Sequence, residues 1–493
     1  MRAYSLWLLR VYQWLLRGAG AYHDVPNIKV SRVAVFNFQA AVVIWRAAKF
    51  FSNHRSIAYL AGISEWLFRN ATKSAPLWIH AHRGLGNLIL FQGRHEEGLA
   101  QLGHAERLRN KLAKVAGWKE DTKVFLPRGC CSVLGGIGMI DGYVKHKILT
   151  GDPRPYYLLA DPIATANSIF LSYWSDYVTI VTDPTKIAEL AKFEAVYGVG
   201  WMTVMPRGDT YVHVHRGISA VQRQWSKESR SPLLLLRDEH RDLLVKYKAK
   251  IGMAEKDWYI CLHVRSHGFH SERRGGSEDI RNAPIEDYYS LIRDVVAAGG
   301  WVVRMGDSSM PALDMSKCGG DHRVIDFAIS FDKSAALDVA LGASCRLFVG
   351  HSSGFHTIPH AFGRPCCMVN IPLTAGFPWH PDDIFVPKKY VSVSSGAALS
   401  LAQLMSSTNI LNADNIFQLA QAELVLLPNE PDELVEAMRE ALAAQTNLKN
   451  PSVADEVIKE FDRLNQTYHA EISGNLSRYY AAKHANTLLA REQ

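Results

Sequence analysis

The chain has 493 residues, of which 48% are hydrophobic and 21% are charged, and its formal net charge is +7. This composition excludes a disordered chain, and the length predicts about three domains. The modest positive charge fits an anionic ligand or membrane surface. Without an arginine-rich tail or an aromatic–basic strip, nucleic acid is not an expected partner.

The first twenty residues combine a short apolar run with spaced basic residues. The run Ala3–Leu9 is too short to span a bilayer, which needs about 20 apolar residues, and Arg10 and Arg17 prevent its extension. The segment also lacks the uninterrupted apolar core of a signal peptide. On a helix its basic and apolar residues fall on opposite faces, which favours an amphipathic helix (residues 1–20) on an anionic membrane surface. The alternative is that the apolar face packs on the protein's own helices.

Residues 1–119 are predicted to be a helical region. The segment 77–110 places Gly86, Gly98 and Ala105 near the small-residue positions of a tetratricopeptide (TPR) helix–turn–helix. A single repeat cannot bury its own face, so we expect this hairpin to stack on the preceding helices. The region is interpreted either as a docking module for a protein partner or a second copy (a homo-oligomer), or as a helical cap on the next domain.

From residue 120 the pattern changes to short apolar strands that alternate with helices. This alternation predicts α/β domains with parallel sheets covered on both faces. The first is expected at residues 120–235, with a glycine-rich loop at Gly135–Gly138 and a strand at Trp201–Met205. The second is expected at residues 236–425, and residues 426–493 are expected to be helices that pack back on both domains.

Glycine and serine follow one strand of the second domain. Ser352, Ser353 and Gly354 lie between an apolar strand and an expected helix at Phe355–Phe362. A serine there would cap the helix, and the free N–H groups of the helix N-terminus would bind a phosphate. The alternative is a plain helix cap without a ligand.

Basic and polar residues follow other strands of the same domain. Arg265 comes directly after an apolar strand, and His263 lies two residues back on the same face. Arg281 and Asn282 add a cation and an amide before a helix opened by a proline. Because the carboxyl ends of parallel strands form the ligand edge of such sheets, these clusters predict an anionic nucleotide ligand. The alternative for each arginine is a structural ion pair.

A third strand end carries Gly306 and Asp307. Asp307 could accept hydrogen bonds from a ribose or sugar hydroxyl, or pair with Arg304. The loop Gly135–Gly138 is close to a dinucleotide loop but has no acidic ribose partner at the expected distance, so an NAD-dependent enzyme is a weak alternative.

Neither cysteines nor histidines show the spacing of a metal site. The seven cysteines form no CxxC motif, which predicts free, buried thiols in a reducing compartment. We therefore expect no bound metal and a cytoplasmic protein, peripheral on the inner face of the membrane. The histidine groups that lack a carboxylate or cysteine at a familiar ligand offset are His213 with His215, and His263 with His267 and His270.

Several of these segments together resemble a bacterial glycosyltransferase family associated with surface and capsular polysaccharide gene clusters. The resemblance covers roughly residues 120–490. It implies a GT-B architecture, with two Rossmann-like domains of which the second holds the nucleotide sugar. The segments that carry it are Leu158–Pro162, Cys261–Arg265, Arg281–Ala283, Trp301–Asp307, Val349–Gly354 and Val369–Leu373.

The element His263-Val264-Arg265 also resembles the His-x-Arg element of fucosyltransferases with this architecture, in which the arginine binds the donor diphosphate. The resemblance implies transfer without a metal or other cofactor. One departure is that Gly138 is followed by Met139 where the family pattern has Gly-His, so a histidine base is absent there or has moved.

The reaction implied is transfer of a sugar from a nucleoside diphosphate sugar to a glycan or lipid-linked acceptor. A base must deprotonate the acceptor hydroxyl, and Asp141, His146 and Asp209 are the candidates from the first domain. The alternative function is a non-catalytic, TPR-type assembly protein with a degenerate transferase part.

Overall fold

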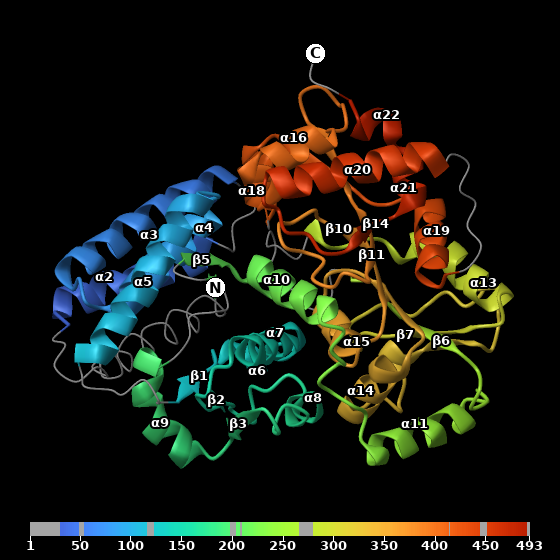
Figure 1. Ribbon diagram of the computed structural model, residues 1–493, viewed down its shortest axis with the longest axis horizontal. Helices are drawn as coiled ribbons and strands as arrows, with labels where there is room; N and C mark the ends of the chain where they lie inside the picture. Colours follow the sequence, from blue (N-terminus) through green and yellow to red (C-terminus); the bar gives the residue numbers. More distant parts are fainter. Residues whose placement is uncertain are drawn as a thin grey trace, which may run out of the picture.

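The computed structural model describes residues 30–48, 54–115, 123–197, 204–207, 210–265, 280–413, 415–443 and 451–490. A helical region lies beside two α/β units, and further helices from the C-terminal part of the chain cover the second unit (Figure 1). This is the predicted fold class, two α/β units behind a helical region. The amphipathic helix predicted for residues 1–20 lies outside the described residues.

The helical region consists of two antiparallel pairs. In the second pair, glycines allow close approach: a Cβ added at Gly86 would lie 2.7 Å from Leu102 Cγ, and one added at Gly98 would lie 2.7 Å from Leu90. The hairpin thus packs through the small residues that the sequence singled out, and it contacts the preceding helix. The four helices are α2 (Arg32–Ala48), α3 (His54–Ser74), α4 (Ile79–Phe91) and α5 (His95–Val115).

The helical region also contacts a distant part of the chain. Phe91 at the end of α4 stacks on Phe417 of α18 (Ile416–Gln421), with ring centroids 5.9 Å apart. Gln418 Nε2 donates a hydrogen bond to Leu90 O at 2.9 Å. The helices are therefore joined to the second α/β unit through side chains more than three hundred residues away in sequence.

The first unit has a small parallel sheet of three strands in the order β1-β2-β3. Its strands are short and apolar, and Trp174 and Tyr143 are fully buried beside them. The elements are β1 (Val124–Phe125), α6 (Gly129–Ser132), α7 (Leu134–Thr150), β2 (Tyr156–Leu159), α8 (Ser168–Ser172), β3 (Val178–Val181) and α9 (Pro184–Tyr197).

Two expectations for the first unit were wrong. The stretch Gly135–Gly138 is part of helix α7 and not a loop. The described part of the expected strand Trp201–Met205 does not join the parallel sheet: β4 (Val204–Arg207) pairs antiparallel with β5 (Thr210–His213). The hairpin contacts α5, so tertiary packing against the helical region replaced sheet pairing. Helix α10 (Val214–Lys227) comes next and packs on α7.

The second unit is built on a seven-stranded sheet in the order β14-β11-β10-β9-β6-β7-β8. All its strand pairs are parallel. Counted from β6 along the chain, this contains the Rossmann strand order 3-2-1-4-5-6. The strands are β6 (Tyr259–His263), β7 (Trp301–Arg304), β8 (Val324–Asp326), β9 (Leu347–Gly350), β10 (Cys366–Ile371), β11 (Ile384–Pro387) and β14 (Asn475–Leu476).

Helices cover both faces of this sheet, as the near-continuous burial of its central strands requires. Phe348 and Phe385 are fully buried between these layers. The segments between the strands form α11 (Asp238–Lys250), which precedes β6, then η1 (Ile285–Tyr288), α13 (Tyr289–Ala297), η2 (Phe327–Ile329), α14 (Ala335–Ser344), η3 (Gly354–His356) and α15 (Thr357–Ala361).

The last hundred residues return to the second unit and complete its sheet. Strand β13 (Leu424–Leu427) pairs antiparallel with β12 (Lys389–Ser392). Within the region 426–493, which was predicted to be helical, α19 (Pro431–Ala441) begins with a proline and a Glu430–Glu433 capping box. The remaining elements are α16 (Leu401–Ser406), α17 (Thr408–Leu411), α20 (Pro451–Thr467), α21 (Arg478–Lys483) and α22 (Ala485–Leu488).

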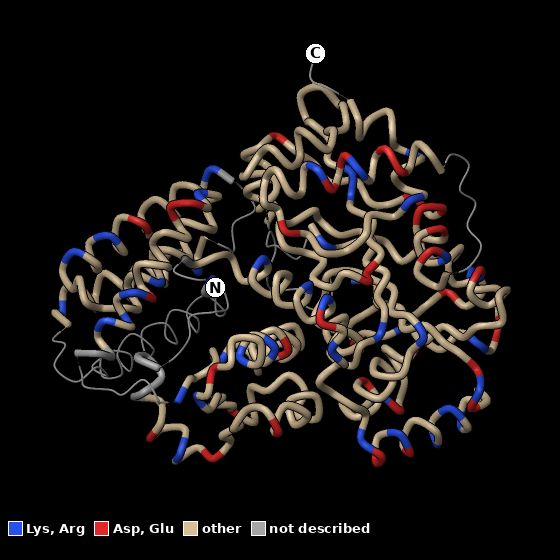
Figure 2. Tube along the Cα trace, in the orientation of Figure 1, with Lys and Arg blue, Asp and Glu red and all other residues tan. Residues whose placement is uncertain are grey.

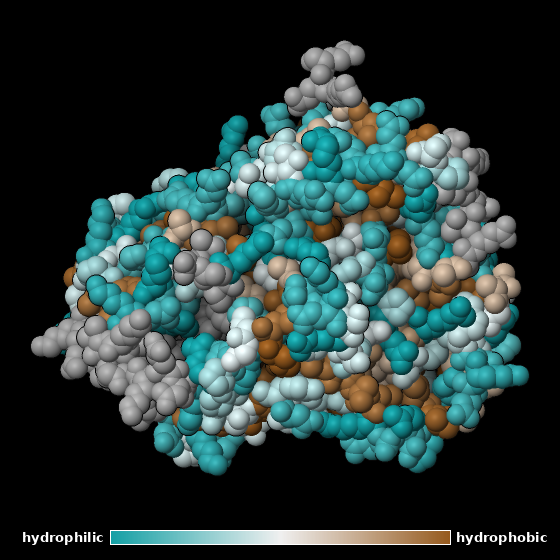
Figure 3. Space-filling model, in the orientation of Figure 1, coloured by the Kyte–Doolittle hydropathy of each residue, from teal (hydrophilic) through white to brown (hydrophobic). Residues whose placement is uncertain are grey.

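The surface offers few large-scale features. Basic and acidic residues alternate along the outer helices (Figure 2). The visible face is mainly hydrophilic with scattered apolar patches (Figure 3). Within the described part of the chain, no helix combines the length and apolarity needed to cross a membrane. All seven cysteines are buried and free, as predicted.

Candidate functional site

The strand order of the second unit defines one edge where a ligand would bind. Strands β6 and β9 are neighbours, but the chain leaves them in opposite directions, so their carboxyl ends form the topological switch point. His263, the last residue of β6, lies opposite Gly350, the last residue of β9. A Cβ on Gly350 would lie 2.4 Å from His263 O, so only glycine permits this approach.

His351 is the centre of a buried polar network at this point. Its Nδ1 accepts a hydrogen bond from the backbone N–H of Arg265 at 3.3 Å, and its Nε2 lies 2.6 Å from Tyr288 Oη. Because a backbone N–H can only donate, Nε2 must carry the imidazole proton. Desolvation holds the pKa of His351 well below its ordinary value, and Lys388, His263 and Arg265 act in the same direction. This imidazole is therefore neutral and fixes the backbone from which Arg265 projects.

The network continues across the next strand. Asn370 Nδ2 donates to Tyr288 Oη at 2.8 Å. Asn370 and Asn429 exchange two hydrogen bonds of 2.6 Å, each from a backbone N–H to the other's side-chain oxygen. Asn370 has a φ of +52°, a left-handed conformation that asparagine tolerates better than most residues. This contact ties the carboxyl end of β10 to the start of α19.

Basic side chains surround this network. Arg281 Nη1 donates to Ser352 O at 3.1 Å, and Lys388 Nζ donates to Asn282 O at 2.5 Å. Arg265 is joined to the same segment, because its carbonyl accepts a hydrogen bond from the Ala283 N–H at 3.3 Å. The structure thus brings together His263, Arg265, Arg281 and Asn282 from the predicted set and adds Lys388. We call Arg265, Arg281 and Lys388 the basic cluster.

Lys388 is the residue of the basic cluster whose charge is least compensated by its surroundings. The residue is 5% exposed, and no carboxylate of the described residues lies within ion-pair distance of its ammonium group. Desolvation lowers its pKa to about 8. A buried cation held only by a carbonyl oxygen is costly unless an anion joins it.

His263 remains neutral beside these cations. Desolvation and the nearby Arg265 together lower its pKa to about 4, although Asp307 acts in the opposite direction. Its ring lies parallel to that of Phe355, with centroids 6.1 Å apart, and its Nδ1 has no hydrogen-bond partner among the described residues. His263 is thus available to a ligand as a hydrogen-bonding group and not as a charge.

The serines lie at the site but do not cap a helix as expected. Ser353 occupies the N-cap position without a side-chain cap, and the expected helix Phe355–Phe362 is a short 3-10 turn, η3, followed by α15. The hydroxyl oxygens of Ser352 and Ser353 are buried without a hydrogen-bond partner among the described residues. Gly354 packs against the first unit, since a Cβ there would lie 2.8 Å from Gly135 N. The site therefore offers hydroxyl groups rather than a long helix N-terminus.

Gly306 and Asp307 follow β7, the neighbour of β6. Gly306 has a φ of +154°, and a Cβ there would lie 2.3 Å from Met310 Sδ. Asp307 Oδ1 accepts from the Ser309 N–H at 2.9 Å. Arg304 is buried and pairs with Asp326 at 3.0 Å, not with Asp307. The carboxylate of Asp307 is thus held near His263 without an arginine partner of its own strand.

The base candidates of the first unit lie away from this edge. Asp141 is buried between α7 and α10, where Lys145 Nζ lies at 2.8 Å and Gln222 Nε2 at 2.6 Å. His146 lies near the C-terminal end of α7, about 18 Å along the helix axis from Leu134. Asp209 lies outside the described residues. The described structure brings neither Asp141 nor His146 to the basic cluster.

The N-terminal turns of α7 instead form a contact between the two units. A Cβ added at Gly138 would lie 2.0 Å from Thr357 Cβ, and Thr357 Oγ1 donates to Leu134 O at 3.2 Å. The glycines that resembled a dinucleotide loop therefore serve close packing against η3 and α15. Because Gly135–Gly138 is helical, it does not form the glycine-rich loop on which the hypothesis of an NAD-dependent enzyme was based.

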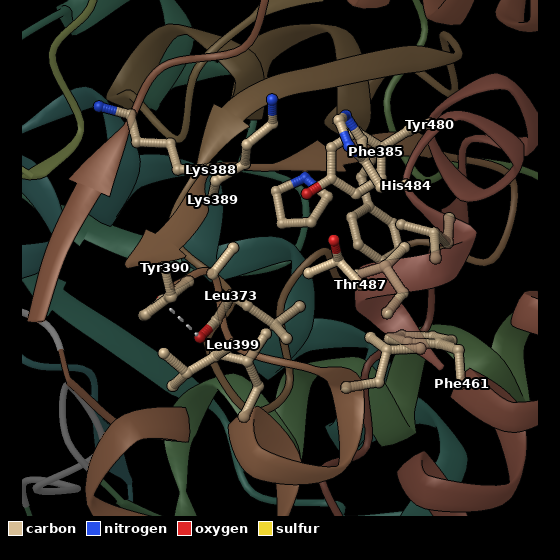
Figure 4. A pocket seen from close by; sticks show the side chains of 16 residues that line it. Leu373, Phe385, Lys388, Lys389, Tyr390, Leu399, Phe461, Tyr480, His484 and Thr487 are labelled. Carbon is tan, nitrogen blue, oxygen red and sulfur yellow. Dashed lines mark hydrogen bonds between the residues drawn. The ribbon is translucent and has the colours of Figure 1, made fainter. Parts of the chain in front are cut away.

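An apolar cavity of about 190 Å³ lies behind the basic cluster, between β11, β12 and the C-terminal helices. Figure 4 shows Lys388 and Lys389 in its wall, with both amines pointing away from it in different directions. Lys389 pairs with Glu430 at 2.6 Å and so is neutralised. The two neighbouring lysines thus differ in environment, which makes Lys389 a control for Lys388.

In the described part of the chain, the residues that could bind a metal ion are not the histidines that the sequence drew attention to. His213 and His215 have ring centroids 5.0 Å apart, and His215 accepts from Trp379 Nε1 at 3.1 Å. Among the described residues, the side chains that could hold a metal ion are His360, Cys366 and Asp383. They lie at the opposite edge of the same sheet, at the starts of β10 and β11.

Sequence reasoning missed Lys388, His351, Tyr288, Asn370 and Asn429. Lys388 directly follows strand β11, and Arg265 lies two residues after β6, so a search of every strand end would have found Lys388 as well. Tyr288 and Asn429 carry no such signal, because their contacts join segments 82 and 59 residues distant from Asn370.

Comparison with known proteins gives structural neighbours only: no protein-family model matches, and neither does any curated protein. The Escherichia coli ADP-heptose LPS heptosyltransferase II structure is 14% identical with a TM-score of 0.37, covering 66% of this chain and 98% of that one. The family 9 glycosyl transferase of Veillonella parvula is 10% identical with a TM-score of 0.37, covering 66% and 97%. A Thermobaculum terrenum O-GlcNAc transferase covers 97% of this chain and 99% of its own, at 11% identity and a TM-score of 0.23. These neighbours are glycosyltransferases, but at such low scores the chemistry of this chain rests on its own strand order and side chains.

Proposed function

We propose that this protein is a glycosyltransferase that moves a sugar from a nucleoside diphosphate sugar to a glycan or lipid-linked acceptor in bacterial surface polysaccharide synthesis. The observation that carries the proposal is the basic cluster at the switch point of a seven-stranded Rossmann-type sheet. Lys388 is its buried cation without a carboxylate partner among the described residues.

The basic cluster suits a diphosphate. Arg265 and Arg281 offer planar guanidinium groups for two-point contacts, and Lys388 offers a point charge. The hydroxyl groups of Ser352 and Ser353 can donate to further phosphate oxygens. As the bond to the sugar breaks, negative charge builds on the β-phosphate, and fixed cations stabilise it.

The sugar and the ribose would be bound by neutral and acidic groups rather than by the basic cluster. His263 stays uncharged and can hydrogen-bond a hydroxyl, and the nearby Asp307 can accept from one. Asp141 is occupied by Lys145 and Gln222, and His146 lies toward the far end of α7.

A panel of nucleoside diphosphates and their sugars tests the proposal. A ligand that binds only the native state raises the melting temperature, so at least one nucleotide should stabilise the full-length protein, whereas inorganic phosphate should do so much less. Lys388→Ala should remove the response and Lys389→Ala should keep it. No response to any nucleotide, or equal responses of the two variants, would contradict the proposal.

The assembly-protein alternative also has a supporting observation. Phe36 of α2 and Tyr59 and Trp66 of α3 are 68%, 71% and 63% exposed, so large apolar side chains of these two helices can reach a partner. A stable partner captured through these helices, without turnover of any sugar nucleotide, would favour that alternative.

A further inference from the structure

A group of three potential metal ligands lies buried at the amino edge of the seven-stranded sheet. His360 is at the end of α15, Cys366 begins β10, and Asp383 directly precedes β11. One donor atom from each lies within 4.8 Å of the others. The residues are 5%, 0% and 1% exposed, so the site is enclosed by the fold. This group shares no residue with the basic cluster, which lies at the other end of the strands.

The protein alone leaves the polar atoms of this group incompletely satisfied. His360 Nε2 lies 3.0 Å from both carboxylate oxygens of Asp383, although its single N–H can serve only one of them well. His360 Nδ1 has no hydrogen-bond partner among the described residues. Cys366 Sγ has only a long contact, 3.7 Å, to Arg364 O. Orphaned polar atoms in a dry interior are costly, which suggests that something else completes the site.

The donor set fits a divalent transition-metal ion. An imidazole nitrogen, a thiolate and a carboxylate are the ligand types that Zn²⁺ takes in proteins. With both acidic groups ionised, one divalent ion makes the buried group electrically neutral. The ring of His380 stacks on that of His360, with centroids 4.0 Å apart, and so shields one side.

We propose that His360, Cys366 and Asp383 bind one divalent transition-metal ion, Zn²⁺ by the chemistry of the donors, with water in the fourth position. The ion would join the end of α15 to the starts of β10 and β11 and so fix the sheet whose other edge carries the basic cluster. Binding would release the protons of the thiol and of any protonated carboxyl or imidazole ligand. The site is independent of the proposed sugar transfer, which would still proceed without a metal in the transfer site.

Co²⁺ tests this site directly, because Co²⁺ bound by a thiolate absorbs in the near ultraviolet and a tetrahedral site adds visible bands. The full-length protein, treated with a chelator, is titrated with Co²⁺ alone. We expect these bands to saturate at one equivalent and to vanish when Zn²⁺ is added. Absence of a saturable thiolate band in the folded protein would overturn the proposal.

The adjacent cysteines provide a matched control. Both are fully buried, but Cys367 is outside the potential metal group and on the other face of β10. Cys366→Ser should abolish the thiolate band, whereas Cys367→Ser should keep it. Equal bands in the two variants would refute the assignment. If Cys366→Ser fails to fold, Asp383→Asn replaces it: we expect at least a tenfold weaker Co²⁺ affinity, and an unchanged affinity would exclude this carboxylate.

Discussion

The two edges of the seven-stranded sheet both bury ionisable side chains, but they balance charge differently. At the carboxyl edge, Lys388 is held by a carbonyl oxygen and faces no carboxylate partner among the described residues. At the amino edge, His360 and Asp383 form a complementary pair beside a thiol. A buried charge without a counter-charge lowers stability until an anion binds beside it, whereas removing one partner of a buried pair leaves the other partner uncompensated and so lowers stability. The two edges should therefore respond to mutation in opposite ways.

The largest expected effects come from one substitution at each edge, of which one changes stability and the other changes nucleotide affinity. Asp383→Ala removes the partner of a buried imidazole and should lower the free energy of unfolding by about 3 kcal/mol, leaving nucleotide affinity unchanged. Lys388→Ala should weaken nucleotide binding about 100-fold, or ~3 kcal/mol, without loss of stability, because it removes a desolvated charge. Denaturant unfolding and nucleotide titration measure the two quantities. An equal loss of stability in both variants would contradict the proposal that the two edges balance their buried charges differently.

A smaller effect is expected within the polar network of the carboxyl edge. Tyr288→Phe removes the hydroxyl that bridges His351 and Asn370, and so leaves two buried groups without a partner. The free energy of unfolding should fall by about 1–2 kcal/mol, and nucleotide affinity should fall with it because Arg265 loses its fixed backbone. Tyr289→Phe is the control, since Tyr289 Oη accepts from the Asp314 N–H away from this network. A Tyr288 variant with unaltered nucleotide affinity would show that the network supports the fold alone.

The smallest expected effect is a pH dependence confined to Lys388. Its folded pKa of about 8 lies below its ordinary value of 10.5, so the charge is lost in the folded protein as pH rises through 8. Nucleotide affinity, taken relative to Lys388→Ala, should decline about twofold by pH 8 and continue to fall. Stability relative to that variant should rise from pH 8 toward 10.5, because the unfolded chain still binds the proton there. If the ratio of nucleotide affinities of the unmodified protein and Lys388→Ala stayed constant across this pH range, the titrating charge would belong to another group.

The alternating strands and helices were readable from sequence because apolar periodicity and turn residues are local properties. The strand ends at Arg265, Asp307 and Ser352 could be found for the same reason, and the parallel sheet could be inferred from the alternation. The loop predicted at Gly135–Gly138 was wrong. A glycine that is needed for close helix packing has the same sequence pattern as a glycine that is needed for a phosphate-binding loop. The close contacts of Gly138 with Thr357 and of Gly135 with Gly354 exist only in the folded chain.

The sequence by itself determined which side chains stand at the ends of strands, since that depends on a few neighbouring residues. Only the tertiary structure decided which of those ends meet. Arg304 pairs with Asp326 and is buried, whereas Lys388 comes to the basic cluster from 106 residues beyond Asn282. Likewise, residues 360, 366 and 383 converge only because β10 and β11 start at the same edge. Register and strand order depend on the burial of the whole sheet, which no short stretch of sequence encodes.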